Sequence, residues 1–327
     1  MKAAVYEKYG APDVVEIREV KKPIIKDNEV LIKIRATTVS SGDWRIRSLD
    51  MPYGFGIMGR LFFGIFSPRQ PILGTELAGE IEAVGKDVRK FKIGDAVFAF
   101  PGGGFGCHAE YRAMPESGNM ALKPANLSYE EAAALSFGGS TALDFLKTKG
   151  NIQRGEKVLI IGASGTVGSA AVQLSKHFGA EVTGVCGTAN LALVRSIGAD
   201  KVIDYTKEDF TKNGETYDII LAAAATASFL RCKGSLRENG RLLMVLAGLP
   251  EMAQIPWAAL TSSKKVFGGP AAERVQDLLI VKELAETGAF KPVIDRRYPL
   301  ERIVEAHAYV DTGHKKGSVV ITVGHDD

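Results

Sequence analysis

The stretch of residues 157–168, KVLIIGASGTVG, constrains the fold more than any other part of the chain. A short apolar segment there runs into a glycine-containing turn and then into residues that begin a helix. The pattern is Ala163-x-Gly165-x-x-Gly168, with Ala at the first glycine position of the dinucleotide-binding fingerprint. Backbone N–H groups at such a helix start bind a pyrophosphate, and the missing side chains let it come close. The stretch predicts a dinucleotide site; the alternative is a glycine-rich connector that binds nothing.

The residues after this stretch alternate between short apolar strands and helices. We expect strands at residues 157–161, 181–186, 202–203, 218–221 and 241–246, and helices at residues 167–178 and 191–197. Gly179 and Gly198 come after the two helices, where glycine commonly ends a helix. Strands that are apolar throughout and separated by helices predict a doubly wound parallel sheet that is buried on both faces.

Both ends of the chain have a different, β-rich character. Short segments there alternate apolar and polar residues between glycine-rich turns, for example at residues 29–36, 79–85 and 95–100. This pattern predicts a small barrel or sandwich. After an expected helix at residues 273–287, the chain returns to β character. The prediction is an α/β protein with a dinucleotide-binding domain, residues 125–289, inserted into a β-rich domain of residues 1–124 and 290–327.

Composition narrows the functional class. The 327 residues suggest two domains at roughly 150 residues per domain. Lys and Arg total 41 against 38 Asp and Glu, and the basic residues are scattered, so no nucleic-acid partner is expected. Three cysteines without a C-x-x-C pair exclude a disulfide framework and favour a reducing, cytoplasmic location. No apolar run approaches the ~20 residues of a membrane helix, and no leader peptide is expected.

The choice of nucleotide depends on the residues after the second strand of the sheet. A carboxylate there binds the adenosine 2′-hydroxyl of NAD and repels the 2′-phosphate of NADP. Residues 185–190, VCGTAN, contain no carboxylate, which favours NADPH over a weaker NADH. Thr188 and Asn190 offer hydrogen-bond donors to a phosphate. The alternative is that they only cap the next helix.

Taken together, these residues resemble the medium-chain dehydrogenase/reductase superfamily, and most closely its zinc-independent quinone oxidoreductase branch. The resemblance covers essentially the whole chain. It depends on residues 1–5, 74–79, 84–85, 94–97, 162–168, 198–205 and 313–317. The family implies a GroES-like β-barrel catalytic domain, a Rossmann domain, and a cleft between them for nicotinamide and substrate. It also implies a homodimer that pairs through the last Rossmann strand, here residues 264–267.

The resemblance implies roles for individual cofactor-binding residues. Thr141 matches a nicotinamide contact, Tyr205 lies near the adenine, and Lys316 reaches the 2′-phosphate region. For Thr141 the alternative is an ordinary helix residue, and for Lys316 an exposed surface lysine. The full set expected around the cofactor is Thr141, Ser164, Gly165, Thr166, Val167, Gly168, Thr188, Asn190, Tyr205, Leu246, Ala247, Phe267 and Lys316.

Zinc-dependent relatives hold their metal with side chains that this chain lacks. Ser40, Thr75 and Phe137 stand at the three ligand positions, and none offers the nitrogen, sulfur or carboxylate that zinc prefers. No metal is therefore expected. Without that electrophile, the expected step is hydride transfer from NADPH to an activated acceptor, a small hydrophobic quinone or α,β-unsaturated carbonyl. The alternatives are an enoyl-thioester reductase and a non-catalytic NADPH-binding sensor or structural protein.

Two residues are candidates for contact with the substrate. Ser40 corresponds to a polar residue near the substrate in zinc-free relatives, or is a strand-end serine bonded to backbone. Arg45 stands where relatives often have Tyr, and it either polarises a carbonyl or pairs with Asp43. Residues 52–68 are unusually apolar for a loop, so they line a substrate pocket, pack on a dimer partner or form a lid.

Overall fold

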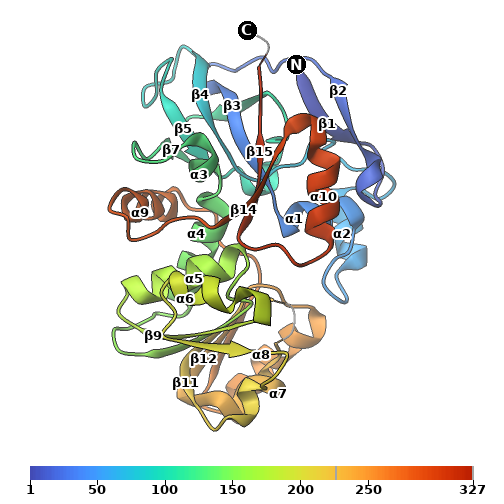
Figure 1. Cartoon of the computed structure of the whole chain (residues 1–327). Helices are drawn as coiled ribbons and strands as arrows, with labels where there is room; N and C mark the ends of the chain where they lie inside the picture. The colour runs from blue at the N-terminus through green and yellow to red at the C-terminus, as the bar shows by residue number, and fades with distance from the viewer. Residues whose placement is uncertain (225–226, 326–327) are drawn as a thin grey trace.

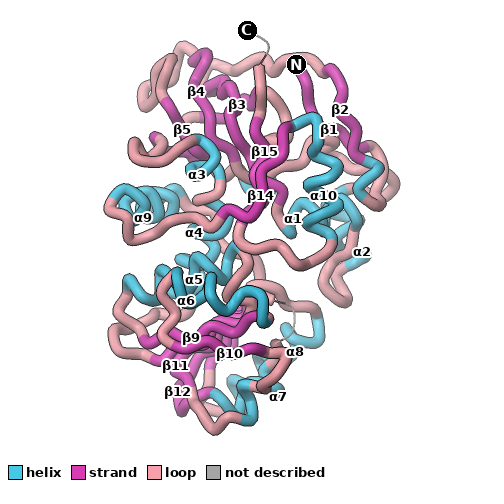
Figure 2. The backbone as a smooth tube through the Cα atoms, viewed as in Figure 1, coloured by secondary structure: helices cyan, strands magenta, loops and turns pink. Residues whose placement is uncertain are grey.

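A parallel sheet of six strands forms one half of the protein, seen in a computed structural model that describes residues 1–224 and 227–325 (Figures 1 and 2). The strand order is β10-β9-β8-β11-β12-β13, and every neighbouring pair is parallel. The strands are β8 (Lys157–Ile161), β9 (Glu181–Cys186), β10 (Lys201–Asp204), β11 (Tyr217–Ala222), β12 (Leu236–Met244) and β13 (Lys265–Gly268). The predicted doubly wound sheet is confirmed.

Helices cover both faces of this sheet, which explains its apolar sequence. In β8, Val158 and Ile160 pack into one hydrophobic cluster, and the alternating Leu159 and Ile161 pack into another. Because each face has its own core, the strand is apolar along its length. The helices of this half are α4 (Ser136–Leu143), α5 (Thr166–His177), α6 (Leu191–Ser196), α7 (Phe229–Cys232), α8 (Leu249–Thr261) and α9 (Val275–Glu286). The short helix α3 (Tyr129–Ala133), which precedes α4 in the chain, packs against the strands of the other half. A π-helical segment, Asp144–Lys149, extends α4.

The other half is built on a seven-stranded sheet, ordered β14-β15-β3-β4-β5-β7 with β6 paired to β3, and a separate β1-β2 pair. Its strands are β1 (Lys2–Tyr6), β2 (Val15–Glu19), β3 (Glu29–Val39), β4 (Leu77–Val84), β5 (Ala96–Ala99), β6 (Tyr111–Pro115), β7 (Met120–Leu122), β14 (Ile294–Pro299) and β15 (Ser318–Thr322). The last strand, β15, is antiparallel to β3, with Val319 opposite Val39. The chain therefore leaves this sheet after β7 and returns to it with β14.

Several helices lie where the sequence predicted none. Residues 303–311 form α10 (Ile303–Asp311), in a tail expected to be β-rich. Ile303, Ala306 and Val310 are buried on it, and this three-to-four-residue spacing is the helical signal that the flanking strands obscured. The apolar segment expected to be a loop contains α2 (Gly56–Phe63). Helix α1 (Ser41–Ser48) precedes it.

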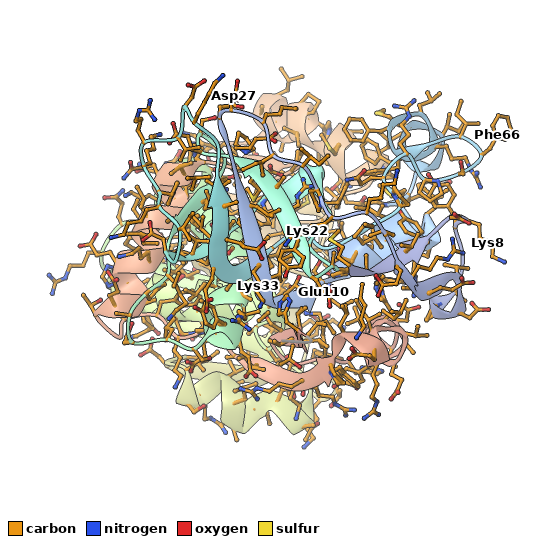
Figure 3. The ribbon with its side chains drawn as sticks, turned by 90° about the horizontal axis from the view of Figure 1, so that it is seen from above. Lys8, Lys22, Asp27, Lys33, Phe66 and Glu110 are labelled. Atoms are coloured by element: carbon orange, nitrogen blue, oxygen red, sulfur yellow. The ribbon has the colours of Figure 1, made fainter. Side chains whose placement is uncertain are left out.

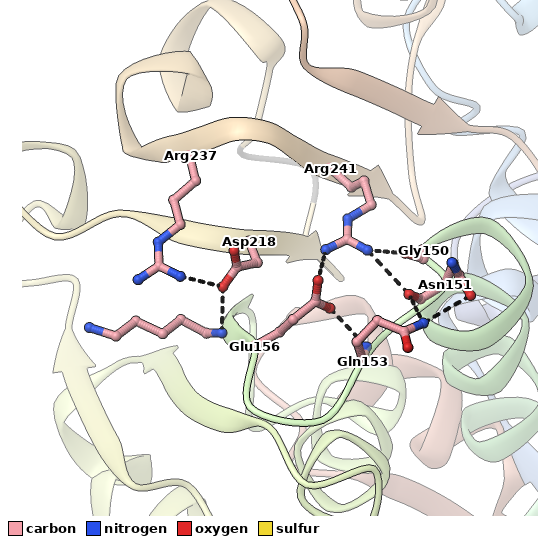
Figure 4. Close-up of polar contacts among 8 residues, drawn as sticks. Gly150, Asn151, Gln153, Glu156, Asp218, Arg237 and Arg241 are labelled. Atoms are coloured by element: carbon pink, nitrogen blue, oxygen red, sulfur yellow. Dashed lines mark hydrogen bonds and ion pairs between the residues drawn. The ribbon is translucent and has the colours of Figure 1, made fainter.

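A polar network ties together the amino ends of the parallel strands (Figure 4). Asp218 accepts hydrogen bonds from the Lys157 backbone and from Arg237, both at 2.8 Å. Arg241 pairs with Glu156 and donates to the Gly150 carbonyl at 2.7 Å. Open parallel sheets bind ligands at the carboxyl ends of their strands. These charges lie at the opposite edge, so they belong to the support of the sheet and not to a ligand site. No helix among the described residues is long and apolar enough to cross a membrane.

Candidate functional site

Glycines shape the turn between β8 and α5. Gly162 has φ +78°, a conformation that glycine adopts readily, so the tight turn lies one residue before Ala163. A Cβ on Gly168 would lie 2.0 Å from the Gly162 carbonyl oxygen, so only glycine fits there. Gly165 is the N-cap of α5, and the nearest atom to its Cβ position is 3.6 Å away. This room beside the first N–H groups of α5 fits a pyrophosphate.

The loop after β9 meets this turn through Asn190. Its amide nitrogen donates to the Ser164 hydroxyl at 3.1 Å. Asn190 is the N-cap residue of α6, but its side chain makes no capping hydrogen bond, so the capping alternative does not describe it. Its Oδ1 is buried and has no partner among the described residues. A buried amide oxygen without a donor indicates a site completed by a ligand or water.

Thr188 has a partner that the sequence did not reveal. Its hydroxyl donates to Asp204 Oδ2 at 2.5 Å, and Thr206 donates twice to Oδ1 of the same carboxylate. These hydrogen bonds lower the pKa of Asp204 below its usual range. In this structure the Thr188 hydroxyl proton therefore bonds to Asp204, whereas it was expected to bond to a phosphate. Tyr205 comes next in the chain, 63% exposed, with its hydroxyl beside Gly187.

Residues 315–317 lie directly against the glycine turn. The Gly317 N–H donates to the Ser164 carbonyl at 2.8 Å, and the Thr166 hydroxyl donates to the Gly317 carbonyl at 2.6 Å. Lys315 Nζ donates to Thr166 Oγ1 at 2.5 Å and to the Gly317 carbonyl at 2.7 Å. Burial lowers the pKa of Lys315 to about 8.

Lys315 brings its ammonium group to the start of α5, whereas Lys316 was expected near the 2′-phosphate region. The Lys316 backbone N–H donates to Asp295 at 2.8 Å. The sequence signal was the Lys-Lys pair in residues 313–317, which does not tell the two lysines apart. Only the contact with Thr166, 149 positions away in the chain, distinguishes them.

The residues expected around the nicotinamide come from three elements. Leu246 and Ala247 come after β12 and Phe267 lies in β13, all half-buried at the carboxyl ends of neighbouring strands. Thr141 is buried in α4. Leu249, which begins α8, reaches the other half of the protein, because its N–H donates to the Tyr53 carbonyl at 2.9 Å.

Ser40 is the N-cap of α1. Its hydroxyl donates to Asp43 Oδ2 at 2.6 Å and accepts from the Asp43 N–H at 3.2 Å, within a capping box. The other Asp43 oxygen accepts from the Gly74 N–H at 2.9 Å. This geometry matches the backbone-bonded alternative for Ser40, and contact with a substrate stays a prediction.

Arg45 does not pair with Asp43, so that expectation is wrong. Its guanidinium donates to the Asp50 carbonyl at 2.8 Å and lies 4.7 Å from the centre of the Trp44 ring. Both Asp43 oxygens already accept hydrogen bonds, from Ser40 and from Gly74. Burial lowers the pKa of Arg45. A role of Arg45 toward a substrate stays a prediction.

A buried carboxyl, Glu76, joins the two halves. Its Oε1 accepts from the Thr38 hydroxyl at 2.5 Å, and its Oε2 accepts from the Phe137 N–H of α4 at 2.6 Å. Glu76 is 1% exposed, and burial raises its pKa to about 7 despite these hydrogen bonds. Sequence analysis assigned this residue no role. The available signal was a lone carboxylate within the otherwise uncharged residues 70–79.

Two of the positions that correspond to zinc ligands in relatives, Thr75 and Phe137, lie beside this carboxyl. Thr75 precedes Glu76 and has a buried hydroxyl without a partner among the described residues. Phe137 contributes its N–H to Glu76, and Ser40 is held by Asp43. Across residues 1–224 and 227–325, no three His, Cys, Asp or Glu side chains gather as metal ligands.

A small cavity of about 130 Å³ borders the apolar segment of residues 52–68. The aromatic rings of Tyr6, Phe62, Phe63 and Phe105 line it, together with Ile46. Phe62 and Phe63 belong to α2, so part of the segment does line a cavity. Gly103 also borders the cavity, and its N–H donates to Glu273 of the parallel-sheet half at 3.1 Å.

Comparisons with known proteins place this architecture. The sequence profile of a family described as "Alcohol dehydrogenase GroES-like domain" matches residues 26–125, and that of "Zinc-binding dehydrogenase" matches residues 197–321. The chain is 34% identical to the 2-methylene-furan-3-one reductase of Solanum lycopersicum, over 98% of this chain and 79% of the relative. It is 31% identical to the quinone oxidoreductase of Homo sapiens, over 96% of this chain and 94% of the relative.

Further matches agree with these. The chain is 31% identical to the chloroplastic NADPH-dependent alkenal/one oxidoreductase of Arabidopsis thaliana, over 98% of this chain and 79% of the relative. The solved structure of the quinone oxidoreductase from Coxiella burnetii superposes with a TM-score of 0.87 at 27% identity, covering 99% of both chains. A GroES-like half joined to a doubly wound half defines a class of two-domain dehydrogenases. The chain belongs to the medium-chain dehydrogenase/reductase superfamily, in its quinone oxidoreductase-like branch.

The raised pKa of Glu76 predicts a pH-dependent stability difference. In the Glu76→Gln variant the amide can still bond to Thr38 and Phe137, but it cannot ionise. As pH rises from about 4.5 to about 7, the unfolded wild type ionises this carboxyl while the folded protein keeps it protonated. The wild type should lose up to roughly 3 kcal/mol of unfolding free energy relative to the variant, with no further change above pH 7. Denaturant unfolding at several pH values measures this.

Glu80, on the neighbouring strand β4, provides a control of opposite sign. Hydrogen bonds from the Tyr129 hydroxyl and from Arg35 lower the pKa of its carboxyl. Against Glu80→Gln, the wild type should therefore gain stability as pH rises toward 4.5. If the wild type and Glu76→Gln keep a constant difference from about pH 4 to about pH 8, the Glu76 carboxyl does not titrate as described.

Proposed function

We propose that the protein is an NADPH-dependent oxidoreductase that reduces quinones or α,β-unsaturated carbonyls without zinc. The observation that carries this proposal is the glycine turn at the start of α5, which Lys315 flanks with a positive charge. Relatives that match nearly the whole chain are named quinone oxidoreductase and NADPH-dependent alkenal/one oxidoreductase, which supports the acceptor class. The same relatives favour an enzyme over a non-catalytic sensor.

The residues of the chain fit a nicotinamide dinucleotide from end to end. The first N–H groups of α5 and the Lys315 ammonium bind the pyrophosphate, because both present positive charge at one place. Tyr205 offers its exposed ring to the adenine. Thr141, Ala247 and Phe267 border the nicotinamide. When bound, the nicotinamide supplies a hydride.

The acceptor class depends on what the chain offers to the substrate oxygen. A plain ketone needs a strong electrophile at its oxygen, whereas a quinone or enone spreads the developing charge over a conjugated system. Ser40, Thr75 and Phe137 offer hydroxyls and a ring, not the ligands that zinc prefers. Hydrogen-bond donors and an apolar pocket suffice for a conjugated acceptor, and the proton comes from solvent.

NADPH, rather than NADH, is the proposed reductant. The loop after β9 contains no carboxylate, which leaves room for a 2′-phosphate. The Asp204 carboxylate beside Thr188 opposes this choice, but three hydrogen bonds and Lys207, 3.8 Å away, offset its charge. The relative named as NADPH-dependent supports the same preference.

Three further features belong to the same proposal. The domains are residues 1–124 with 290–327 and residues 125–289. The protein is a homodimer that pairs through the open edge of β13, which among the described strands is bonded only to β12. Its location is the cytoplasm, which three free, buried cysteines support, although some relatives are named chloroplastic or mitochondrial.

The experiment that tests this function measures NADPH and NADH consumption by absorbance. 9,10-Phenanthrenequinone, a medium-chain enone and a simple ketone are compared, each with and without a chelator. We expect turnover of the quinone or the enone, no turnover of the ketone, and no effect of the chelator. Turnover of the ketone that the chelator abolishes would refute the zinc-free assignment. Tight NADPH binding with no turnover of any acceptor would favour a sensor instead.

The two neighbouring lysines predict a sharp difference in cofactor binding. Lys315→Met removes the ammonium at the start of α5, so the Kd for NADPH should rise about tenfold to a hundredfold, the value of a charge-assisted hydrogen bond. Lys316→Met, the matched control, should change Kd by about twofold or less. Fluorescence titration measures both. A larger effect at Lys316 would show that the proposal names the wrong lysine.

The nucleotide preference predicts the effect of moving one carboxylate. The double variant Thr188→Asp with Asp204→Asn keeps the net charge but places the carboxylate on the loop after β9. Its affinity for NADPH should fall at least about tenfold relative to NADH, because the new carboxylate repels the 2′-phosphate. Asp204→Asn alone is the control, and it should favour NADPH. An unchanged ratio in the double variant would remove the basis of the NADPH assignment.

A further inference from the structure

Helix α2 and its flanking residues expose an unusual apolar surface. Seven large apolar side chains in the short stretch of residues 53–66 are exposed to solvent. Their exposed fractions are 82% for Tyr53, 80% for Ile57, 57% for Met58, 57% for Leu61, 70% for Phe62, 47% for Ile65 and 93% for Phe66. Single exposed apolar residues are ordinary, but a contiguous group marks an interaction surface. We call these seven side chains the apolar face.

The geometry of α2 turns this face outward. Ile57, Met58, Leu61 and Phe62 occupy positions i, i+1, i+4 and i+5, which lie on one side of a helix. The opposite side faces the protein, where Gly59 is buried against Met51. A surface helix normally points its apolar side to the core, so α2 is reversed.

Hydrogen bonds at the carboxyl end of α2, one of them from the distant Tyr9, hold the helix in this orientation. The Tyr9 hydroxyl donates to the Gly64 carbonyl at 2.9 Å, and the Arg69 N–H donates to the Phe63 carbonyl at 2.8 Å. Arg60 donates to the Ile65 carbonyl at 3.0 Å. The apolar face is thus presented on a fixed support rather than on a loose loop.

Positive charge accompanies the apolar face. Residues 51–75 contain Arg60 and Arg69 and no Asp or Glu. Both arginines are exposed. Figure 3 shows Phe66 and the exposed Lys8 projecting outward on the same side of the molecule. Apolar side chains with basic neighbours are the composition of elements that lie in the interface of a membrane.

We propose that the apolar face docks on the surface of a lipid bilayer that contains anionic headgroups. The seven side chains enter the boundary between headgroups and acyl chains, and the two arginines contact the headgroups. A second copy of the chain fits less well, because a twofold interface would bring the same positive charges together. The proposal goes beyond the proposed function, since docking requires neither NADPH nor an acceptor.

The position of the apolar face gives docking a consequence for substrate access. Phe62 belongs to the face and also lines the cavity of about 130 Å³. Tyr53 contacts Leu249 of the parallel-sheet half, next to the residues proposed around the nicotinamide. A docked molecule therefore holds its cavity beside the membrane, where apolar quinones dissolve. This consequence, unlike docking itself, depends on the proposed function.

Sedimentation with vesicles tests the proposal. The full chain is spun with vesicles of phosphatidylcholine alone or of phosphatidylcholine mixed with phosphatidylglycerol. The test variant is the double substitution Ile57→Ser and Phe66→Ser. Ile24→Ser is the matched control, because Ile24 is 93% exposed and lies outside the face. Arg69→Gln tests the charge. Thermal unfolding of each variant shows that it is folded.

Each outcome supports or overturns the proposal. We expect the wild type and Ile24→Ser to pellet with the anionic vesicles, and less so at high salt. The double variant should lose at least about tenfold in partitioning, because it lacks two large apolar side chains that the bilayer would bury. Arg69→Gln should lose only the preference for anionic vesicles.

Two outcomes refute docking. One is a wild type that stays in the supernatant with both kinds of vesicle, and the other is a double variant that binds the vesicles as well as the wild type. Sedimentation velocity without vesicles identifies the rival, because a smaller oligomer in the double variant alone would assign the face to a second copy.

Discussion

The contact between residues 164–166 and 315–317 is the constraint on which the site depends. It joins the turn after β8 to the segment that enters β15, so the glycine turn of one half is fixed by the other half. Gly317 has φ +61°, and a Cβ there would lie 2.1 Å from the Val293 carbonyl oxygen. Only glycine lets the segment run this close to Val293 while it bonds to the turn. The ammonium of Lys315 reaches the start of α5 because of this approach, and so the charge at the site and the placement of the two halves have one cause.

Polar groups carry further contacts between the halves. Glu76 holds the start of α4 against β3 through the Phe137 N–H and the Thr38 hydroxyl, and Glu273 accepts from Gly103 near the small cavity. Burying a carboxylate is costly, so the pKa of Glu76 is raised and the carboxyl keeps its proton up to about pH 7. Its directional hydrogen bonds define how α4 meets the sheet. These polar contacts add direction to the apolar cluster that spans both halves, which contains Phe98 of one half and Val158 of the other.

Local patterns allowed much of this to be predicted from the sequence. The strands β8 and β9, the glycine turn and α5 depend on residues close together in the chain. Contacts between residues far apart in the chain could not be predicted from the sequence. Thr188 was expected to donate to a phosphate, but Asp204, 16 positions away, accepts its proton. Arg45 does not pair with Asp43, whose Oδ1 instead accepts from Gly74, 31 positions away. Residues two positions apart on a helix point in different directions. Helix α10 was missed because strands flank it on both sides.

The cofactor side of the protein and the side of α2 differ in which groups they bury. At the cofactor side, charged and polar groups are partly buried and satisfied by one another, as Lys315, Thr166 and Asp204 show. At the side of α2, large apolar groups are exposed, and nothing within the described chain covers them. A protein that only had to bury apolar surface would turn the wide apolar side of α2 inward. The hydrogen bond from the Tyr9 hydroxyl to the Gly64 carbonyl, at the end of α2, opposes this rotation. The exposed face is thus maintained by specific contacts, and its persistence is explained by a nonpolar environment outside the chain.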